Sequence, residues 1–180
     1  GIQLIPSSVE DFAIAGQQLV YTLTVRNLSE TRTDTFNLHL SNHLGPTSLL
    51  TPTVRLEPCE TAKTVLKIDV PPDVARDVVH ETVLTAVSSQ SQTQLTLTHK
   101  TPGDFLLVDD DRWYEQRPLF LEALAQNGIF PDVWETGINQ EGRGSPSLAF
   151  LEHYEAVIWY TAYDWFDPVT VAENEILEQY

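Results

Sequence analysis

The chain has 180 residues, which is enough for one large domain or two small ones. Its formal net charge of −16 repels phosphate backbones and anionic lipid surfaces, so nucleic-acid binding is not expected. No run of about 18 apolar residues occurs, so membrane insertion is not expected, and no basic segment precedes an apolar stretch as it would in a signal peptide.

Charge and aromatic content are divided unevenly along the chain. Residues 1–100 carry 7 Lys or Arg and 10 Asp or Glu, whereas residues 101–180 carry 3 and 16, a net charge of −13. Of the 17 aromatic residues, 14 follow residue 100, including all four tryptophans. We therefore predict two domains, 1–101 and 102–180, that meet near Thr101-Pro102-Gly103.

Short segments that alternate apolar and polar residues fill the first hundred positions, with turn residues between them. The clearest segments are Tyr21–Val25, Phe36–Leu40, Val65–Val70 and Leu95–Leu97. A period of two with one apolar face is typical of strands that cover a core on one side. About seven such strands in a hundred residues predict an all-β immunoglobulin-like (Ig-like) sandwich.

Three segments of this half also resemble a known family. Val20–Asn27, Asp34–Leu38 and Val54–Thr61 are similar to bacterial Ig-like modules of the alpha-galactosidase-associated type, which accompany secreted glycosidases and peptidases. The resemblance implies a spacer or adhesion module, extracellular or at the cell surface, with no catalytic residues of its own. Cys59 stands where the family has a glycine in its turn.

Two residues of this half invite a chemical interpretation. Asn27-Leu28-Ser29 fits the glycosylation acceptor pattern, but a turn asparagine is the interpretation we favour. Cys59 is the single cysteine, so no internal disulfide can form, and no neighbouring histidine or basic pair activates its thiol.

Strand and helix patterns alternate after residue 101. Phe105–Val108 is a continuous apolar run, which predicts a strand buried on both faces. A helix is expected next, with Pro118 in its first turn, Gly128 just past its end, and an apolar face of Phe120, Leu121 and Leu124.

A second strand at Asp132–Glu135 and a third at Ala156–Tyr160 continue the α/β pattern. Ser145 is predicted to cap a helix with Pro146 at its first position, and Leu148 and Leu151 are expected to point inward. Thr170 to Glu173 forms a capping box for a last helix, in which Ala172, Ile176 and Tyr180 share one face. Right-handed crossovers give the strand order 2-1-3, a partial flavodoxin-like three-layer α/β domain with a parallel sheet.

The second half resembles two families to different degrees. Response-regulator receivers also have an apolar strand that ends in acids, but they need a phosphoacceptor aspartate where this chain has Trp159-Tyr160-Thr161. Leu106–Asp111, Asp132–Trp134 and Leu151–Thr161 are more similar to the start of a class I glutamine-amidotransferase-like domain. That resemblance implies a nucleophile after a later strand, outside these 180 residues.

The candidate site is the acidic end of the first strand, Asp109, Asp110 and Asp111, with Thr161 and Asp164 from the loop after the third strand. These acids either cap loop amides, hold Ca²⁺ or Mg²⁺ with Asp109 and Asp110 as ligands, or form a hydrolytic carboxylate pair. At most two of the three can converge, because adjacent strand residues point to opposite faces. No catalytic residue is assigned, and no cofactor other than Ca²⁺ or Mg²⁺ is expected.

Aromatic residues near the acids are mostly expected in the core and at interfaces. Trp113, Trp165 and Phe166 are alternatively candidates for stacking on a sugar ring.

The leading functional hypothesis is a non-catalytic structural or adhesion fragment of a secreted or cell-surface bacterial protein. The alternatives are an accessory region of an extracellular peptidase or glycosidase whose catalytic residues lie elsewhere, or a calcium- or carbohydrate-binding module. The expected partners are the rest of the parent protein and a second copy, paired through the exposed edge of strand 156–160.

Overall fold

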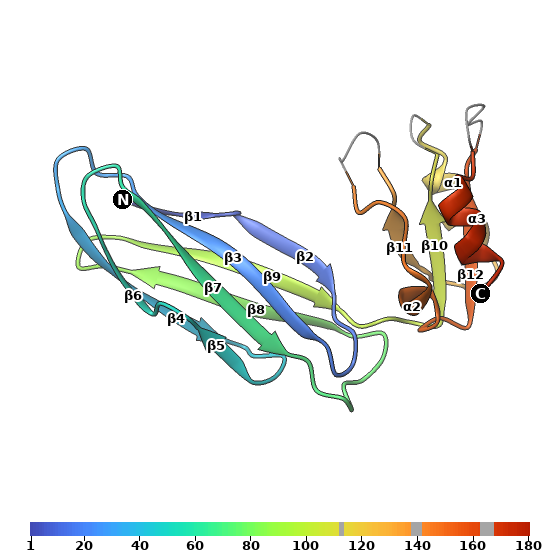
Figure 1. The fold of residues 1–180 in the computed structure, drawn as a ribbon, viewed down its shortest axis with the longest axis horizontal. Helices are drawn as coiled ribbons and strands as arrows, with labels where there is room; N and C mark the ends of the chain where they lie inside the picture. The colour runs from blue at the N-terminus through green and yellow to red at the C-terminus, as the bar shows by residue number, and fades with distance from the viewer. Residues whose placement is uncertain (112–113, 138–141, 163–167) are drawn as a thin grey trace. The chain divides into compact units, whose positions relative to one another are not determined.

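The computed structural model describes residues 1–111, 114–137, 142–162 and 168–180. The chain forms two compact units, Gly1–Thr101 and Pro102–Tyr180, each with its own secondary structure (Figure 1). The division falls where the composition of the chain changes. In the described part of the chain, no helix has the length and apolar character needed to cross a membrane.

The first unit consists of two β-sheets. The four-stranded sheet has the order β1 (Ile2–Ile5), β3 (Gln18–Asn27), β7 (Thr61–Asp69), β5 (Thr47–Leu49). The five-stranded sheet has the order β2 (Ser8–Phe12), β9 (Gln92–Lys100), β8 (Val79–Val87), β4 (Asp34–Ser41), β6 (Thr53–Leu56). All pairs are antiparallel except β2 with β9, which is parallel.

Alternate residues of the long strands point inward and form one apolar core. Leu23 of β3 and Leu66 of β7 come from one sheet, and Phe36 of β4, Leu84 of β8 and Leu97 of β9 from the other. All five are at most 1% exposed. The predicted Ig-like β-sandwich is therefore confirmed, because the period of two places one apolar face of each sheet against the other.

Asn27 ends β3 as a buried turn residue. Its side-chain amide donates to the carbonyl oxygens of Arg32 at 2.8 Å, Leu56 at 3.2 Å and Glu57 at 3.2 Å. Its Oδ1 accepts from the backbone N–H of Ser29 at 2.9 Å. The turn interpretation is confirmed, since a side chain that is 1% exposed and bonded on both ends serves the fold.

Cys59 occupies the turn between β6 and β7 with a positive φ of 60°. Its backbone N–H donates to the carbonyl of Ser29 at 3.0 Å, and Glu60 donates to the carbonyl of Glu57 at 3.1 Å. A residue with a Cβ atom is strained in this left-handed region, whereas glycine is not. The turn at Cys59 thus has a conformation that glycine would adopt without strain.

We expect Cys59→Gly to stabilise the first unit by about 1 kcal/mol, because it removes this strain at the cost of a more flexible unfolded chain. Denaturant unfolding monitored by circular dichroism measures the change. Cys59→Ala is the control, since it removes the thiol and keeps the Cβ atom. An equal gain in Cys59→Ala would contradict backbone strain as the cause.

The described residues of the second unit form a small parallel sheet and three helices. Its elements are β10 (Phe105–Asp109), α1 (Arg117–Ala125), β11 (Asp132–Glu135), α2 (Leu148–Leu151), β12 (Ala156–Tyr160) and α3 (Val171–Leu177). The strands have the order β11-β10-β12, which is the predicted 2-1-3. Leu106, Leu107 and Val108 of β10 are all 0% exposed, as expected for a strand covered on both faces.

The residues predicted to begin or end the helices are found at those positions for two of the three helices, α1 and α3. Pro118 lies in the first turn of α1, and Gly128 follows that helix with a φ of 74°. Thr170 and Glu173 form the predicted capping box of α3. Both patterns depend on residues close together in the chain, so the sequence alone was enough to predict them.

The predicted cap at Ser145 is wrong. Helix α2 is capped by Ser147, whose extended backbone lets its Oγ accept from the N–H of Phe150 at 3.3 Å. Ser145 instead donates from its Oγ to Glu173 of α3 at 2.6 Å. Leu151 is buried as predicted, and Leu148 is half-buried.

The predicted apolar face of α3 is only partly correct. Ile176 packs against the core of the unit, but Ala172 is exposed and Tyr180 is 46% exposed. The buried residue of this helix is Glu173, because its carboxylate is held by Ser145 and by the backbone N–H of Thr170.

Candidate functional site

The candidate site lies where β10 ends, at the carboxyl edge of the three-stranded sheet. Asp109, Asp110 and Asp111 are 5%, 2% and 6% exposed. They are buried because they continue a strand that is covered on both faces. Carboxylates removed from water need donors within the protein, so the partners of each one define what the site can do.

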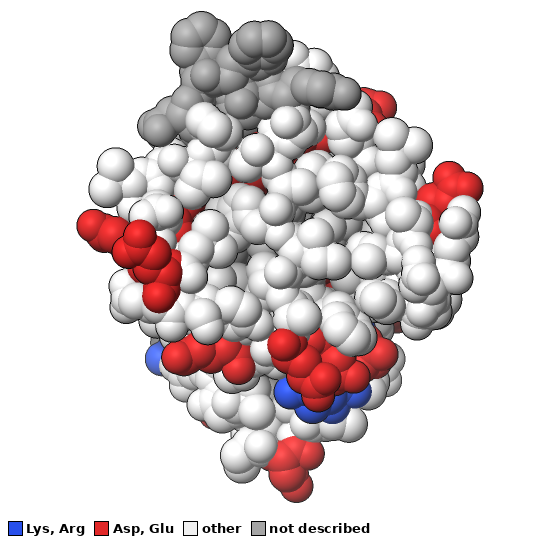
Figure 2. Space-filling model, turned by 90° about the vertical axis from the view of Figure 1, so that its right-hand side faces the viewer, with Lys and Arg blue, Asp and Glu red and all other residues white. Residues whose placement is uncertain are grey.

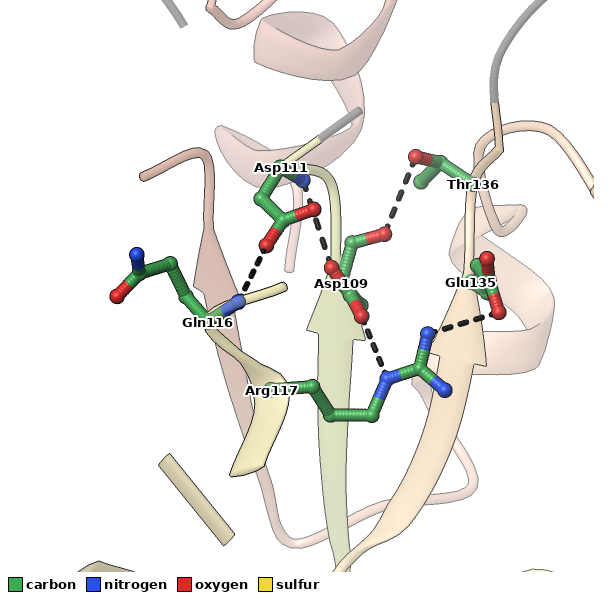
Figure 3. A network of polar contacts seen from close by, with 6 residues as sticks. All are labelled: Asp109, Asp111, Gln116, Arg117, Glu135 and Thr136. Carbon is green, nitrogen blue, oxygen red and sulfur yellow. Dashed lines mark hydrogen bonds and ion pairs between the residues drawn. The ribbon is translucent and has the colours of Figure 1, made fainter. Parts of the chain in front are cut away.

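Asp109 and Asp111 lie on the same side of the strand, next to the start of α1 (Figure 3). The Oδ2 of Asp109 accepts from Nε of Arg117 at 2.6 Å. The Oδ2 of Asp111 accepts from the backbone N–H of Gln116 at 3.0 Å, and its own N–H points to Oδ1 of Asp109 at 3.5 Å. Both carboxylates thus lie near the positive end of a helix, which favours negative charge.

Arg117 bridges two strands at this edge. Besides Asp109, its Nη2 donates to Oε2 of Glu135, the last residue of β11, at 2.8 Å (Figure 3). Burial lowers the pKa of Arg117, but hydrogen bonds to the two carboxylates outweigh it and raise the pKa above its ordinary value. The guanidinium therefore stays charged and acts as a fixed cross-link.

Asp110 points to a different set of partners. Its Oδ1 accepts from Oγ1 of Thr136 at 2.7 Å, and its Oδ2 accepts from Nε1 of Trp159 at 3.1 Å. The backbone N–H of Thr136 donates to the carbonyl of Asp109 at 3.0 Å. Asp110 therefore joins the ends of β11 and β12 through its two oxygens.

Tyr160, the last residue of β12, lies beside Asp109 in the parallel register. Its ring stacks on Phe120 of α1, with centroids 4.1 Å apart. Among the described residues its buried hydroxyl has no partner in hydrogen-bonding geometry, although the Asp109 carboxylate lies near it. Burial, followed by the interaction with the nearby Asp109 carboxylate and the charge of Asp111, raises the pKa of Tyr160.

Asp111 is the aspartate of this site whose pKa is raised. Burial raises the pKa of its carboxyl; the Gln116 N–H lowers it, and the neighbouring Asp109 raises it further. Asp111 therefore holds its proton to a higher pH than an exposed aspartate does. Because the folded pKa lies above the unfolded value, this group favours the fold at low pH and opposes it as the pH rises through the folded pKa.

Asp109 and Asp111 are the two acids that lie together, which is within the limit that at most two of the three can converge. In the predicted metal pair, the Asp109 carboxylate bonds to Arg117 while the Asp110 carboxylate bonds to Thr136 and Trp159, because adjacent strand residues alternate in direction. Within the described residues, no group of three or more His, Cys, Asp or Glu is arranged to hold a metal ion.

The remaining predicted residues come from the loops at this edge. Thr161 follows β12 directly and is half-buried. Outside the described residues lie the other four: Asp164, Trp113, Trp165 and Phe166.

Sequence reasoning missed Arg117, Thr136 and Trp159 as members of the site. Arg117 carried a usable signal: it is one of three basic residues after position 100, and it begins a helix, where the dipole disfavours a cation. Thr136 also carried a signal, because it directly follows strand β11, which was predicted to pair with β10. Trp159 carried no signal, because an aromatic residue in a buried strand is ordinarily core.

Acidic residues elsewhere in the structure are more dispersed. On the face drawn in Figure 2, acidic side chains form separate groups around the margin, with uncharged surface between them. By contrast, the three carboxylates at the end of β10 are buried next to one another, and Arg117 forms an ion pair with one of them, Asp109.

Comparison with known proteins leaves the family open. No protein-family model matches the chain, and no curated protein matches it. Solved structures similar to it include the periplasmic chaperone SfaE, with 16% identity, 57% of this chain and 59% of that chain covered, and a TM-score of 0.42. The CupB2 chaperone of Pseudomonas aeruginosa has 17% identity over 55% of each chain and a TM-score of 0.44.

A family 123 glycoside hydrolase from Clostridium perfringens is also similar, with 8% identity, 58% of this chain and 26% of that chain covered, and a TM-score of 0.45. This chain therefore spans less than two thirds of each of these proteins. With every one of these TM-scores below 0.5, nothing about function follows from the likenesses.

We expect Arg117→Gln to destabilise the second unit by about 1–2 kcal/mol near neutral pH, because Asp109 and Asp111 lose their cation while Arg117 itself is partly exposed. The deficit should shrink as the pH falls, because the raised pKa of Asp111 removes part of the negative charge that Arg117 offsets. Thermal unfolding between neutral pH and about pH 4 measures this. Arg117→Lys keeps the positive charge but loses the two-pronged guanidinium, so its stability should fall between those of the wild type and Arg117→Gln. A loss of stability in Arg117→Gln that does not change with pH would contradict the electrostatic cause.

Proposed function

We propose that this chain is a non-catalytic structural part of a secreted or cell-surface bacterial protein, in which an Ig-like module precedes an α/β domain of the flavodoxin-like, class I glutamine-amidotransferase-like type. The observation that carries the proposal is that each of the three buried aspartates accepts a hydrogen bond from a donor of the protein itself. The acids are thereby used to hold the fold.

The direction of these bonds supports a structural role. Both oxygens of Asp110 and the Oδ2 of Asp109 are taken up by Thr136, Trp159 and Arg117. The donors come from α1, from the end of β11 and from β12, so the acids tie together three elements that meet at the edge of the sheet. A carboxylate that acts on a substrate must instead direct a lone pair toward it.

The first unit supports the extracellular location through its sequence. Val20–Asn27, Asp34–Leu38 and Val54–Thr61 carry the resemblance to modules that accompany secreted glycosidases and peptidases. Two sheets packed over one apolar core form a rigid spacer, which is the role we assign to residues 1–101.

A second candidate is an accessory region of an extracellular hydrolase. It is favoured by the pairing of Asp109, which is bonded to Arg117, with Asp111, whose pKa is raised. Enzymes that use acid–base catalysis often have two neighbouring carboxyl groups whose environments give them different proton affinities. In this case the catalytic residues would lie in another part of the parent protein.

A turnover screen separates the structural role from an enzyme that is complete within this chain. The chain is incubated with chromogenic glycosides and with a fluorogenic peptide library, alongside Asp109→Ala and an Asp34→Ala control in the first unit. We expect no hydrolysis above buffer in any sample. Hydrolysis by the wild type and by Asp34→Ala that is lost in Asp109→Ala would overturn the structural role.

A cation is tested separately by calorimetric titration with Ca²⁺ and with Mg²⁺. If the acids serve only the fold, we expect no heat of binding at millimolar concentration. Saturable heat that disappears in Asp111→Asn would show instead that the Asp109 and Asp111 pair holds an ion.

We also propose that the chain dimerises through β12. Within the described residues this strand pairs only with β10, so its other edge has backbone groups free for a second strand, and its residues Ala156 to Trp159 are half-buried. Light scattering over a range of concentrations should give a rising mass that levels off at twice the monomer. A constant monomer mass up to about millimolar concentration would contradict the proposal.

A further inference from the structure

A row of polar side chains crosses the five-stranded sheet of the first unit. In the strand register, Asp11 of β2 lies beside His99 of β9, and His80 of β8 lies on the other side of His99. Residues in register on neighbouring strands point to the same face of a sheet. His99 is 0% exposed, so this row faces the interior of the sandwich.

His99 also connects the two sheets. Its Nε2 lies 3.0 Å from the hydroxyl of Tyr21 on β3, in the opposite sheet, and the two rings are 5.7 Å apart. Among the described residues, Nδ1 of His99 is buried with no hydrogen-bond partner, and so is Nε2 of His80. Buried polar atoms nearly always have partners, so two such nitrogens on paired residues are exceptional.

A proton added to His99 would create a cation in an interior position with no exposed surface. Of the charged and titratable groups that face the ring, Asp11 on β2 favours this cation and His80 on β8 opposes it, while Tyr21 on β3 contributes only a hydroxyl. Burial lowers the pKa of His99, Asp11 raises it and His80 lowers it, and the net direction is downward.

We propose that the row of Asp11, His99 and His80 is an acid-sensitive device that loosens one end of the sandwich. Protonation of His99 places a positive charge beside a second imidazole in the core, and water must enter between the sheets to solvate it. The segment that loosens includes the end of β9, through which the chain runs into the second unit.

The same end of the sandwich is closed by Thr101. Its backbone N–H donates to the carbonyl of Val78 at 2.9 Å, and its Oγ1 accepts from the N–H of Val78 at 2.9 Å. These bonds lie two residues from His99 along the chain. Loosening around His99 would therefore release the residues that lead directly into Pro102.

The sign of the pH effect follows from the direction of the shift. The unfolded or locally opened chain takes up a proton at the ordinary histidine pKa of 6.5, and the folded chain does so only at lower pH. Stability is therefore complete above about pH 6.5 and falls as the pH decreases toward the folded pKa. At a pH below the folded pKa, the equilibrium constant for local opening is about tenfold larger for each unit by which folding lowers the pKa of His99.

Two measurements on the full chain test the proposal. Proton NMR should show the ring of His99 titrating below the ordinary value of 6.5. Hydrogen exchange at about pH 7.5 and about pH 5, corrected for intrinsic rates, should show faster exchange in residues 97–101 at the lower pH. Amides around Phe36, elsewhere in the sandwich, should keep their protection.

Variants identify the residues responsible. His99→Gln keeps a polar group beside Tyr21 but has no titratable ring, so the acid response should disappear. The same replacement at exposed His39, on β4 of the same sheet, should leave the response unchanged. His80→Gln should raise the pKa of His99, and Asp11→Asn should lower it.

The proposal fails if His99 titrates at its ordinary value, if exchange in residues 97–101 does not change with pH, or if all amides of the first unit respond together. It also fails if His99→Gln responds to acid as the wild type does. Should that variant not fold, the titration of His99 and the local exchange in the wild type decide the matter by themselves.

Discussion

The second unit depends on burying three consecutive carboxylates at the end of a strand that is covered on both faces. Each buried carboxylate needs a hydrogen-bond donor, and these donors determine which elements surround the end of the strand. Arg117 begins α1 although the helix dipole disfavours a cation there, because the Asp109 and Glu135 carboxylates hold it. Thr136 and Trp159 complete the set around Asp110, so the ends of α1, β11 and β12 meet at one point.

Two of the buried polar residues of the sandwich, Asn27 and His99, differ in how well their hydrogen-bonding groups are satisfied. Asn27 has every side-chain bond it needs, from three carbonyl oxygens and one N–H, and it simply fastens a turn. His99 is equally buried but has a partner for only one ring nitrogen among the described residues. Since a neutral imidazole tolerates this and a charged one does not, His99 makes the stability of the sandwich depend on pH.

Local patterns along the chain predicted much of the architecture. The alternation in the first hundred residues, the continuous apolar run before Asp109 and the capping box at Thr170 each depend on near neighbours, and each is found as predicted. The cap at Ser145 failed because two serines precede the helix, and a contact with Glu173 from a later helix occupies the first.

For the feature that dominates the chain, the sequence by itself determined that acids follow a buried strand and that only two of them can share a side. Only the tertiary structure decided that the two are Asp109 and Asp111, and which donors each of the three carboxylates meets. Arg117 bonds to Asp109 and the backbone N–H of Gln116 to Asp111, whereas Thr136 and Trp159 bond to Asp110. The physical reason is range: alternation along a strand is a property of adjacent residues, whereas a donor for a buried charge comes from whichever element the fold brings beside it.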